Sequence, residues 1–124
     1  ASRRQVDKFR GRVAANTGDG LISMFDGAER AVRCGAAITE EAVRLGLGLR
    51  CGIHTGEVEV IPDNIHGVAV HIVSRVMALA TAGEVLVSGT TYELVADSDL
   101  RFEDRGSHEL KGVKGARQIW ALAS

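Results

Sequence analysis

The sequence predicts an α+β fold in which helices cover one face of a mostly antiparallel sheet. Short strand-like runs joined by glycine-containing turns occur near both ends of the chain, as is typical of β-hairpins. Two longer apolar or amphipathic segments end at glycines, as is typical of helices. The expected order is helix end, β, β, α, β, α, β, α, β, β, which fits an α+β sandwich.

The first part of the chain is expected to hold a helix end and a hairpin. Residues 3–9 have the pattern of the last turns of a helix that stops at Gly11. Residues 12–17 and 21–25 are predicted to be two strands joined by the tight turn Gly18-Asp19-Gly20.

The middle of the chain is predicted to hold two helices around one long strand. Asp26 is expected to cap a helix that runs to about residue 45. Residues 49–61 alternate strongly enough to predict a single strand, and residues 62–67 a polar loop. A second, almost wholly apolar helix is expected over 68–82. The remaining expected elements are a strand at 84–88, a short helix at 90–96, and a final hairpin with arms 101–110 and 118–122.

Length and composition favour one globular domain and exclude several classes of partner. The 124 residues suffice for one domain, and 45% hydrophobic with 25% charged residues is an ordinary globular composition. The net charge of −1 gives no basic surface for nucleic acid or an anionic membrane. No apolar run approaches the roughly 18 residues of a membrane span, and no signal peptide is visible. Cys34 and Cys51 fit no metal motif and are expected to be buried free thiols in a reducing cytoplasm.

Three groups of residues are candidate functional sites, and each also has an interpretation in which its role is only structural. The Asp19 carboxylate, between two glycines, is suited to Mg²⁺, although the same residues also make a plain hairpin turn. His71 and Arg75 share a face of the apolar helix, where an arginine either binds an anion or reaches solvent or an ion pair. Lys111 and Lys114 in a glycine-rich turn suit a triphosphate or a solvated hairpin tip. A metal carboxylate with cations for phosphate is typical of nucleotide chemistry.

The order of these motifs resembles the class III nucleotidyl cyclase catalytic domain, in particular the actinobacterial adenylate cyclases. The similarity extends over essentially the whole chain. The stretches that carry it are Thr17-Gly18-Asp19-Gly20, Phe25-Asp26-Gly27, Arg30-Ala31-Val32-Arg33-Cys34, Gly52-Ile53-His54-Thr55-Gly56-Glu57-Val58, Gly67-Val68-Ala69-Val70-His71-Ile72, Arg75-Val76, Gly83-Glu84-Val85-Leu86-Val87-Ser88, Phe102-Glu103-Asp104-Arg105-Gly106 and Glu109-Leu110-Lys111-Gly112-Val113.

The resemblance implies a ferredoxin-like α/β sandwich and a homodimer with active sites shared between subunits. The implied enzyme is a phosphorus–oxygen lyase that converts ATP to 3′,5′-cyclic AMP and pyrophosphate with two Mg²⁺ or Mn²⁺ ions. Asp19 matches the second metal-binding aspartate, and Arg75 matches the transition-state arginine. His71 stands at the transition-state asparagine position. Lys111 lies in the tip that reaches the phosphates, where Lys114 is an alternative because the tip is one residue longer.

The sequence also departs from the family pattern. The Phe-Thr-Asp strand that supplies the first metal aspartate is not found before Arg3, so residues 1–124 are expected to be an N-terminally incomplete cyclase homology domain. Ala15 replaces the lysine that reads the purine, and Asn64 replaces its aspartate partner, so GTP is an alternative substrate. Two hypotheses therefore remain: an active adenylate cyclase, or a degenerate domain that serves as a nucleotide-binding or dimerisation module.

Overall fold

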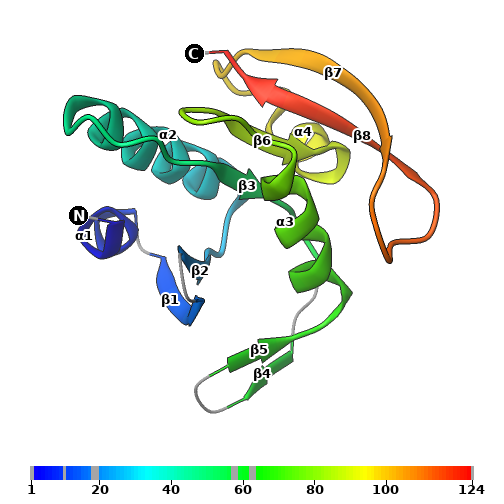
Figure 1. Ribbon diagram of the computed structural model, residues 1–124, viewed down its shortest axis with the longest axis horizontal. Coiled ribbons are helices and arrows are strands. Elements are labelled where there is room, and N and C mark those ends of the chain that lie inside the picture. Colours follow the sequence, from blue (N-terminus) through cyan, green and yellow to red (C-terminus); the bar gives the residue numbers. More distant parts are fainter. Residues whose placement is uncertain (1, 10, 18–19, 57–58, 62–63, 124) are drawn as a thin grey trace.

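The computed structural model describes residues 2–9, 11–17, 20–56, 59–61, 64–123 of the chain (Figure 1). Its elements, in chain order, are α1 (Ser2–Lys8), β1 (Arg12–Thr17), β2 (Gly20–Met24), α2 (Ala28–Arg44), β3 (Cys51–Ile53), β4 (Glu59–Ile61), β5 (Asn64–His66), α3 (Val68–Ala78), β6 (Val85–Ser88), α4 (Gly89–Val95), β7 (Phe102–Glu109) and β8 (Ala116–Leu122).

The central sheet has four strands in the order β3-β6-β8-β7. Strands β3 and β6 run parallel, and the β6–β8 and β7–β8 pairs are antiparallel. Two further antiparallel pairs, β1–β2 and β4–β5, form separate two-stranded sheets. The predicted α+β class is confirmed, with a mixed sheet at its centre. In Figure 1 the β4–β5 hairpin extends away from this sheet, and β1–β2 lies beside α1.

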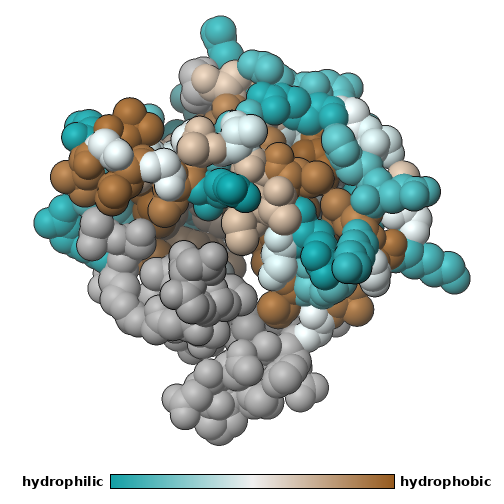
Figure 2. All heavy atoms as spheres, viewed as in Figure 1, coloured by the Kyte–Doolittle hydropathy of each residue, from teal (hydrophilic) through white to brown (hydrophobic). Residues whose placement is uncertain are grey.

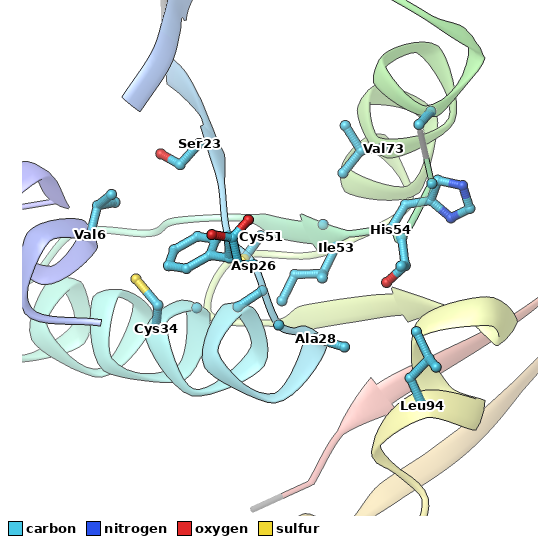
Figure 3. A pocket seen from close by; sticks show the side chains of 18 of the residues that line it. Val6, Ser23, Asp26, Ala28, Cys34, Cys51, Ile53, His54, Val73 and Leu94 are labelled. Carbon is cyan, nitrogen blue, oxygen red and sulfur yellow. The ribbon is translucent and has the colours of Figure 1, made fainter. Parts of the chain in front are cut away.

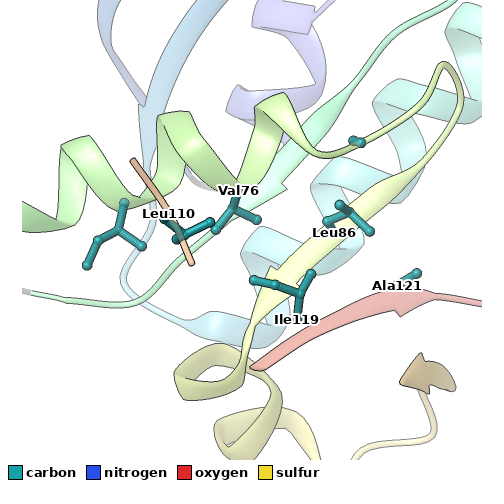
Figure 4. Packing of buried hydrophobic residues seen from close by; sticks show 7 residues of the cluster. Val76, Leu86, Leu110, Ile119 and Ala121 are labelled. Carbon is teal, nitrogen blue, oxygen red and sulfur yellow. The ribbon is translucent and has the colours of Figure 1, made fainter. Parts of the chain in front are cut away.

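Helices cover both faces of the sheet, which differs from the expected single covered face. Leu86 of β6 packs with α3 through Ile72 and Val76 (Figure 4). Its neighbours Val85 and Val87 pack on the other side, in the cluster that contains Val32 of α2. Every residue of β6 is buried, so this strand has no solvent face. Such a continuous apolar run is typical of a strand covered on both faces.

The aromatic residues complete the cluster on the α2 side of the sheet. The rings of Tyr92 and Trp120 stack with centroids 3.8 Å apart. Phe102 meets Tyr92 edge-on at 5.5 Å. These contacts attach α4 to β7 and β8, because Tyr92 belongs to α4 and the other two rings belong to the final hairpin.

The prediction of one strand over 49–61 is wrong, because β3 ends at Ile53 and β4 begins at Glu59. Ile53 pairs with Val87, and β6 gives way to α4 at Gly89, so the partner of β3 runs out at this point. The predicted loop 62–67 is also wrong in part, because residues 64–66 form β5, which pairs with β4. Residues 57–58 and 62–63 lie outside the described residues.

Two predicted helix boundaries need correction. The cap of α2 is Gly27 and not Asp26, and no side chain caps this helix. The helix α3 ends at Ala78, short of residue 82, and the chain then turns through Gly83, whose φ is 85°. The amide of Gly83 donates to the Leu49 carbonyl at 2.7 Å, which fixes the turn beside the start of β3. A positive φ is readily adopted only by glycine, which suits Gly83 to this turn after the end of α3.

The remaining elements match the sequence-based expectations, with small shifts at their ends. Cys34 and Cys51 are free thiols, as predicted, but only Cys34 is fully buried, and Cys51 is half-buried. No helix among the described residues is long and apolar enough to cross a membrane. Figure 2 shows hydrophobic side chains gathered near the end of α2, where three residues are at least 60% exposed: Val43, Leu45 and Leu47.

Candidate active site

A pocket of about 620 Å³ lies between β2, β3 and α2 (Figure 3). Ser23 lines it from β2, Cys34 from α2, and Ile53 from β3. The start of α3 contributes Ala69 and Val70. Most of this lining is apolar, so the pocket walls suit a chain segment better than a charged ligand.

The pocket separates two strand edges of the described structure. β3 is the last strand of the four-stranded sheet, and β2 hydrogen-bonds only to β1 among the described strands. The Ser23 hydroxyl is buried and lacks a hydrogen-bond partner among the described residues. Because buried polar groups are normally paired, this hydroxyl marks the pocket as a place where a polar partner fits.

The α3 helix presents Arg75 at its last turn. Ile72 and Val76 are 3% and 0% exposed and fix the helix on the sheet. Arg75 itself is half-buried, and its Nε has no hydrogen-bond partner within the described part of the chain. A buried guanidinium N–H without a partner is costly, so Arg75 is well suited to receive an anion.

His71 lies one turn before Arg75 and contacts the turn between β7 and β8. Its Nε2 is 2.9 Å from the Lys111 carbonyl oxygen. Leu110, just before Lys111, is 5% exposed in the α3 core cluster, and Val113 packs against that cluster. The structure therefore brings His71 and Lys111 together, and both side chains are exposed.

The other predicted site residues are described only in part. Asp19 lies outside the described residues, although Thr17 pairs with Gly20 on either side of it. Asn64 is the first residue of β5, and Ala15 pairs with Ile22 in the β1–β2 hairpin. The side chains of both residues lie outside the described part. Lys114 is exposed. Across the residues that are described, no group of three His, Cys, Asp or Glu side chains is placed to hold a metal ion.

Sequence analysis missed a polar network at the end of β3. His54 Nδ1 is 2.6 Å from the Ser88 hydroxyl, and Thr55 is 2.9 Å from Thr91, each joined by a hydrogen bond between side chains. Burial lowers the pKa of His54, and the charge of Arg117 lowers it further. The signal available in the sequence was the polar pair His54-Thr55 directly after an apolar strand.

The two thiols that line the pocket are poor nucleophiles. Burial raises the pKa of Cys34 to about 11. Burial also raises the pKa of Cys51 to about 12, with a smaller contribution from the nearby Cys34. Because the thiolate is the reactive form, both residues act as small apolar side chains of the pocket wall.

Comparison with known proteins identifies the family of the chain. The sequence profile described as "Adenylate and Guanylate cyclase catalytic domain" matches residues 24–124. A Rhizobium meliloti protein provisionally named adenylate cyclase 3 is 32% identical in an alignment 124 residues long, which covers 93% of this chain and 21% of that protein. An uncharacterised protein of Mycobacterium tuberculosis is 30% identical in an alignment 108 residues long, which covers 85% of this chain and 37% of that protein. The chain thus spans well under half the length of both relatives.

A solved structure supports the fold. An adenylate/guanylate cyclase/hydrolase from Silicibacter pomeroyi superimposes with a TM-score of 0.85 at 23% identity, covering 98% of this chain and 78% of that chain. The profile match covers α3 and the β7–β8 turn, which lie within residues 24–124. The chain belongs to the adenylate and guanylate cyclase catalytic domain family.

Proposed function

We propose that this chain is the catalytic domain of a cytoplasmic adenylate cyclase that converts ATP to 3′,5′-cyclic AMP and pyrophosphate. The observation that carries the proposal is the face of α3 that bears Arg75 and His71. Arg75 has a buried Nε without a partner among the described residues, and His71, one turn away, contacts the turn that bears Lys111. The match of residues 24–124 to the cyclase family supports the proposal.

The proposed reaction is an internal displacement at the α-phosphorus. The ribose 3′-hydroxyl gives its proton to a solvent water and its oxygen bonds to the α-phosphorus, while the bond from that phosphorus to the pyrophosphate oxygen breaks and pyrophosphate leaves. Negative charge develops on the phosphate oxygens during this step. Arg75 is proposed to donate hydrogen bonds to these oxygens, with His71 beside it, and the ammonium group of Lys111 to hold the leaving phosphates.

Asp19 is proposed to bind a divalent cation. A carboxylate oxygen is a ligand that Mg²⁺ and Mn²⁺ prefer, so the residue type fits the metal that the family implies. The metal, when bound, would supply positive charge against the phosphates.

The pocket between β2 and β3 is proposed to hold a further strand of the same protein, so that residues 1–124 form an incomplete domain. Three features support this proposal: two strand edges border the pocket, its walls are largely apolar, and the Ser23 hydroxyl needs a partner. The family resemblance implies that this strand carries the first metal-binding aspartate, which would act together with Asp19. The site would then be completed by a second copy of the chain, because Asp19 and Arg75 would come from different subunits.

The experiment is an assay of the intact protein with Mn²⁺ and either ATP or GTP. Cyclic AMP is expected from ATP, and the Asp19→Ala variant is expected to give none. Mixing Asp19→Ala with Arg75→Ala chains should restore product at one of the two shared sites. If the parent protein forms no more product than the Asp19→Ala variant, the proposal is overturned. If it prefers GTP to ATP, the proposed substrate is wrong.

A second candidate is a nucleotide-binding or dimerisation module without turnover. The observation that favours it is Ala15, which stands in β1 where the family has a purine-reading lysine. A module of this kind should bind ATP or form dimers in the intact protein while giving no cyclic nucleotide with any metal. Dimerisation is measured by sedimentation, and binding by calorimetry with ATP and Mn²⁺.

A further inference from the structure

The hydrogen bond between His71 and the β7–β8 turn has a defined donor and a defined acceptor. A carbonyl oxygen can only accept a hydrogen bond, so the Nε2 of His71 must carry the proton and donate to Lys111. Nδ1 is then the ring atom that remains for another partner. The contact joins side chain to backbone, and it leaves the Lys111 ammonium group out of the bond.

The contact with His71 leaves no room for a side chain at Gly112. Its φ is 79°, and a Cβ atom at this residue would lie 2.7 Å from His71 Nε2. Gly115, in the same turn, has nearly the same φ of 81°, but a Cβ atom there would meet nothing within 4 Å. Both positions need glycine for backbone conformation, and Gly112 alone of the two must also leave room for the imidazole.

The rest of the turn is held by apolar packing. Leu110 points into the α3 cluster beside Val76 (Figure 4), and Val113 packs against the same cluster. The Val113 amide donates to the Leu110 carbonyl at 2.9 Å. Lys111 and Gly112 are the two central residues of the turn that this bond closes, and the bond from His71 to the Lys111 carbonyl ties that turn to α3.

We propose that His71 is a positioning residue, which holds the turn on α3 through Lys111 and Gly112 and so places the Lys111 ammonium group for the phosphates of a nucleoside triphosphate. The ligand part of this inference rests on the proposed function. His71 and Arg75 lie one helical turn apart on α3, so the contact sets where Lys111 stands relative to that face.

The test compares Gly112→Ala with Gly115→Ala, each with His71 present and with His71→Ala, in the intact protein. Hydrogen exchange of the peptide spanning 110–115 reports on the turn whether or not a nucleotide binds. Gly112→Ala should speed exchange more than Gly115→Ala when His71 is present. With His71→Ala the two glycine variants should have equal effects, because the clash is gone.

The second readout is affinity for a fluorescent ATP analogue with Mn²⁺. Gly112→Ala and His71→Ala should each weaken binding about tenfold, equivalent to 1.4 kcal/mol, and Gly115→Ala by less than about twofold. His71→Gln should recover part of the loss, because its side-chain amide can donate to the same carbonyl.

Equal exchange for the two glycine variants with His71 present would overturn the contact. The expected exchange pattern with unchanged analogue affinity in every variant would overturn the positioning role. If the parent protein binds no analogue, the proposed function fails, and the exchange comparison still decides whether His71 fixes the turn.

Discussion

The four-stranded sheet and the β1–β2 hairpin differ in how they are stabilised. Strand β6 is buried on both faces and has partners on both sides, β3 and β8. The hairpin pairs only within itself among the described strands, and its contacts include α1 and β5. Arg75, His71 and Lys111 belong to the sheet region, whereas Asp19, which lies outside the described residues, comes directly before β2 in the sequence. The proposed site therefore joins two regions whose stability has different origins.

The pocket lies at the boundary between these two regions. Ser23 lines it from the hairpin side, and Ile53 lines it from the sheet side. The Ser23 hydroxyl on the hairpin wall has no described partner, whereas the residues of β3 that line the pocket, Cys51–Ile53, are apolar. Substitutions in the sheet should therefore change the stability of the whole domain, and substitutions in the hairpin should change it less.

The largest expected effect is on stability, for Ile119→Ala. Ile119 is 1% exposed and packs with Ile72, Val76 and Leu86 against α3. Its truncation leaves a cavity in a close-packed core and should cost about 2–5 kcal/mol of unfolding free energy. Urea denaturation followed by circular dichroism measures the change.

The hairpin control for that measurement is Ser23→Ala. The Ser23 hydroxyl has no partner among the described residues, and if the proposed further strand supplies one, its removal should cost at most about 1.5 kcal/mol. A loss from Ser23→Ala as large as that from Ile119→Ala would break the contrast between the two regions.

The next largest expected effect is a fall in turnover in the Arg75→Ala variant. If Arg75 donates to the developing phosphate charge, its loss should cost about a hundredfold to a thousandfold in kcat. Arg75→Lys keeps the charge but loses the planar fork, so it should recover only part of the activity. The measurement is steady-state formation of cyclic nucleotide, with the melting temperature of each variant as control. Unchanged kcat in Arg75→Ala would remove this residue from the mechanism.

A smaller loss of stability is expected for Gly52→Ala, which tests how closely α3 must approach β3. A Cβ atom at Gly52 would lie 2.5 Å from the Met77 backbone nitrogen, so the helix must move. Overpacking of this kind costs about 1–3 kcal/mol. The matched control is Gly89→Ala, where a Cβ atom meets Gln118 at ordinary contact distances of 3.5–3.6 Å. Equal melting temperatures for the two variants would mean that the helix adjusts without strain.

The sequence predicted secondary-structure elements well where residues close together in the chain determine them. Glycines and alternating patterns located both terminal hairpins, because turn chemistry and strand alternation act over a few residues. The strand over 49–61 was mispredicted because its end depends on β6, a strand more than 30 residues later in the chain. Coverage of both sheet faces was signalled by the continuous apolar run of β6, but the run alone does not say which helix covers each face.

The sequence identified candidate site residues by their type, but it did not predict the contacts that these residues make. Arg75 and His71 on one helix face follow from helical periodicity. The bond from His71 to the Lys111 backbone joins residues 40 positions apart, so no local pattern contains it. The His54–Ser88 bond spans 34 positions and was missed for the same reason.

The smallest expected effect is a pH dependence of stability caused by His54. Its pKa lies below the usual 6.5, because burial and then the Arg117 charge disfavour the protonated ring. The unfolded chain therefore takes up this proton at a higher pH than the folded domain does. The stabilisation is complete above about pH 6.5 and is lost as pH falls through the folded pKa. Urea midpoints measured between pH 5 and pH 7.5 should decrease toward acid.

The control for this effect is His54→Asn, whose amide can still bond to the Ser88 hydroxyl but does not titrate. The difference in slope between parent and variant isolates His54 from the other histidines. Glu41, Glu84 and Asp99 also have lowered pKa values, because they accept hydrogen bonds from Gln5, Thr81 and Arg33 respectively. Those carboxylates lose their stabilising effect below about pH 4.5, outside the measured range. Identical slopes for parent and His54→Asn would mean that the ring charges in the folded domain as readily as in water, and the network at the end of β3 would then tolerate a protonated imidazole.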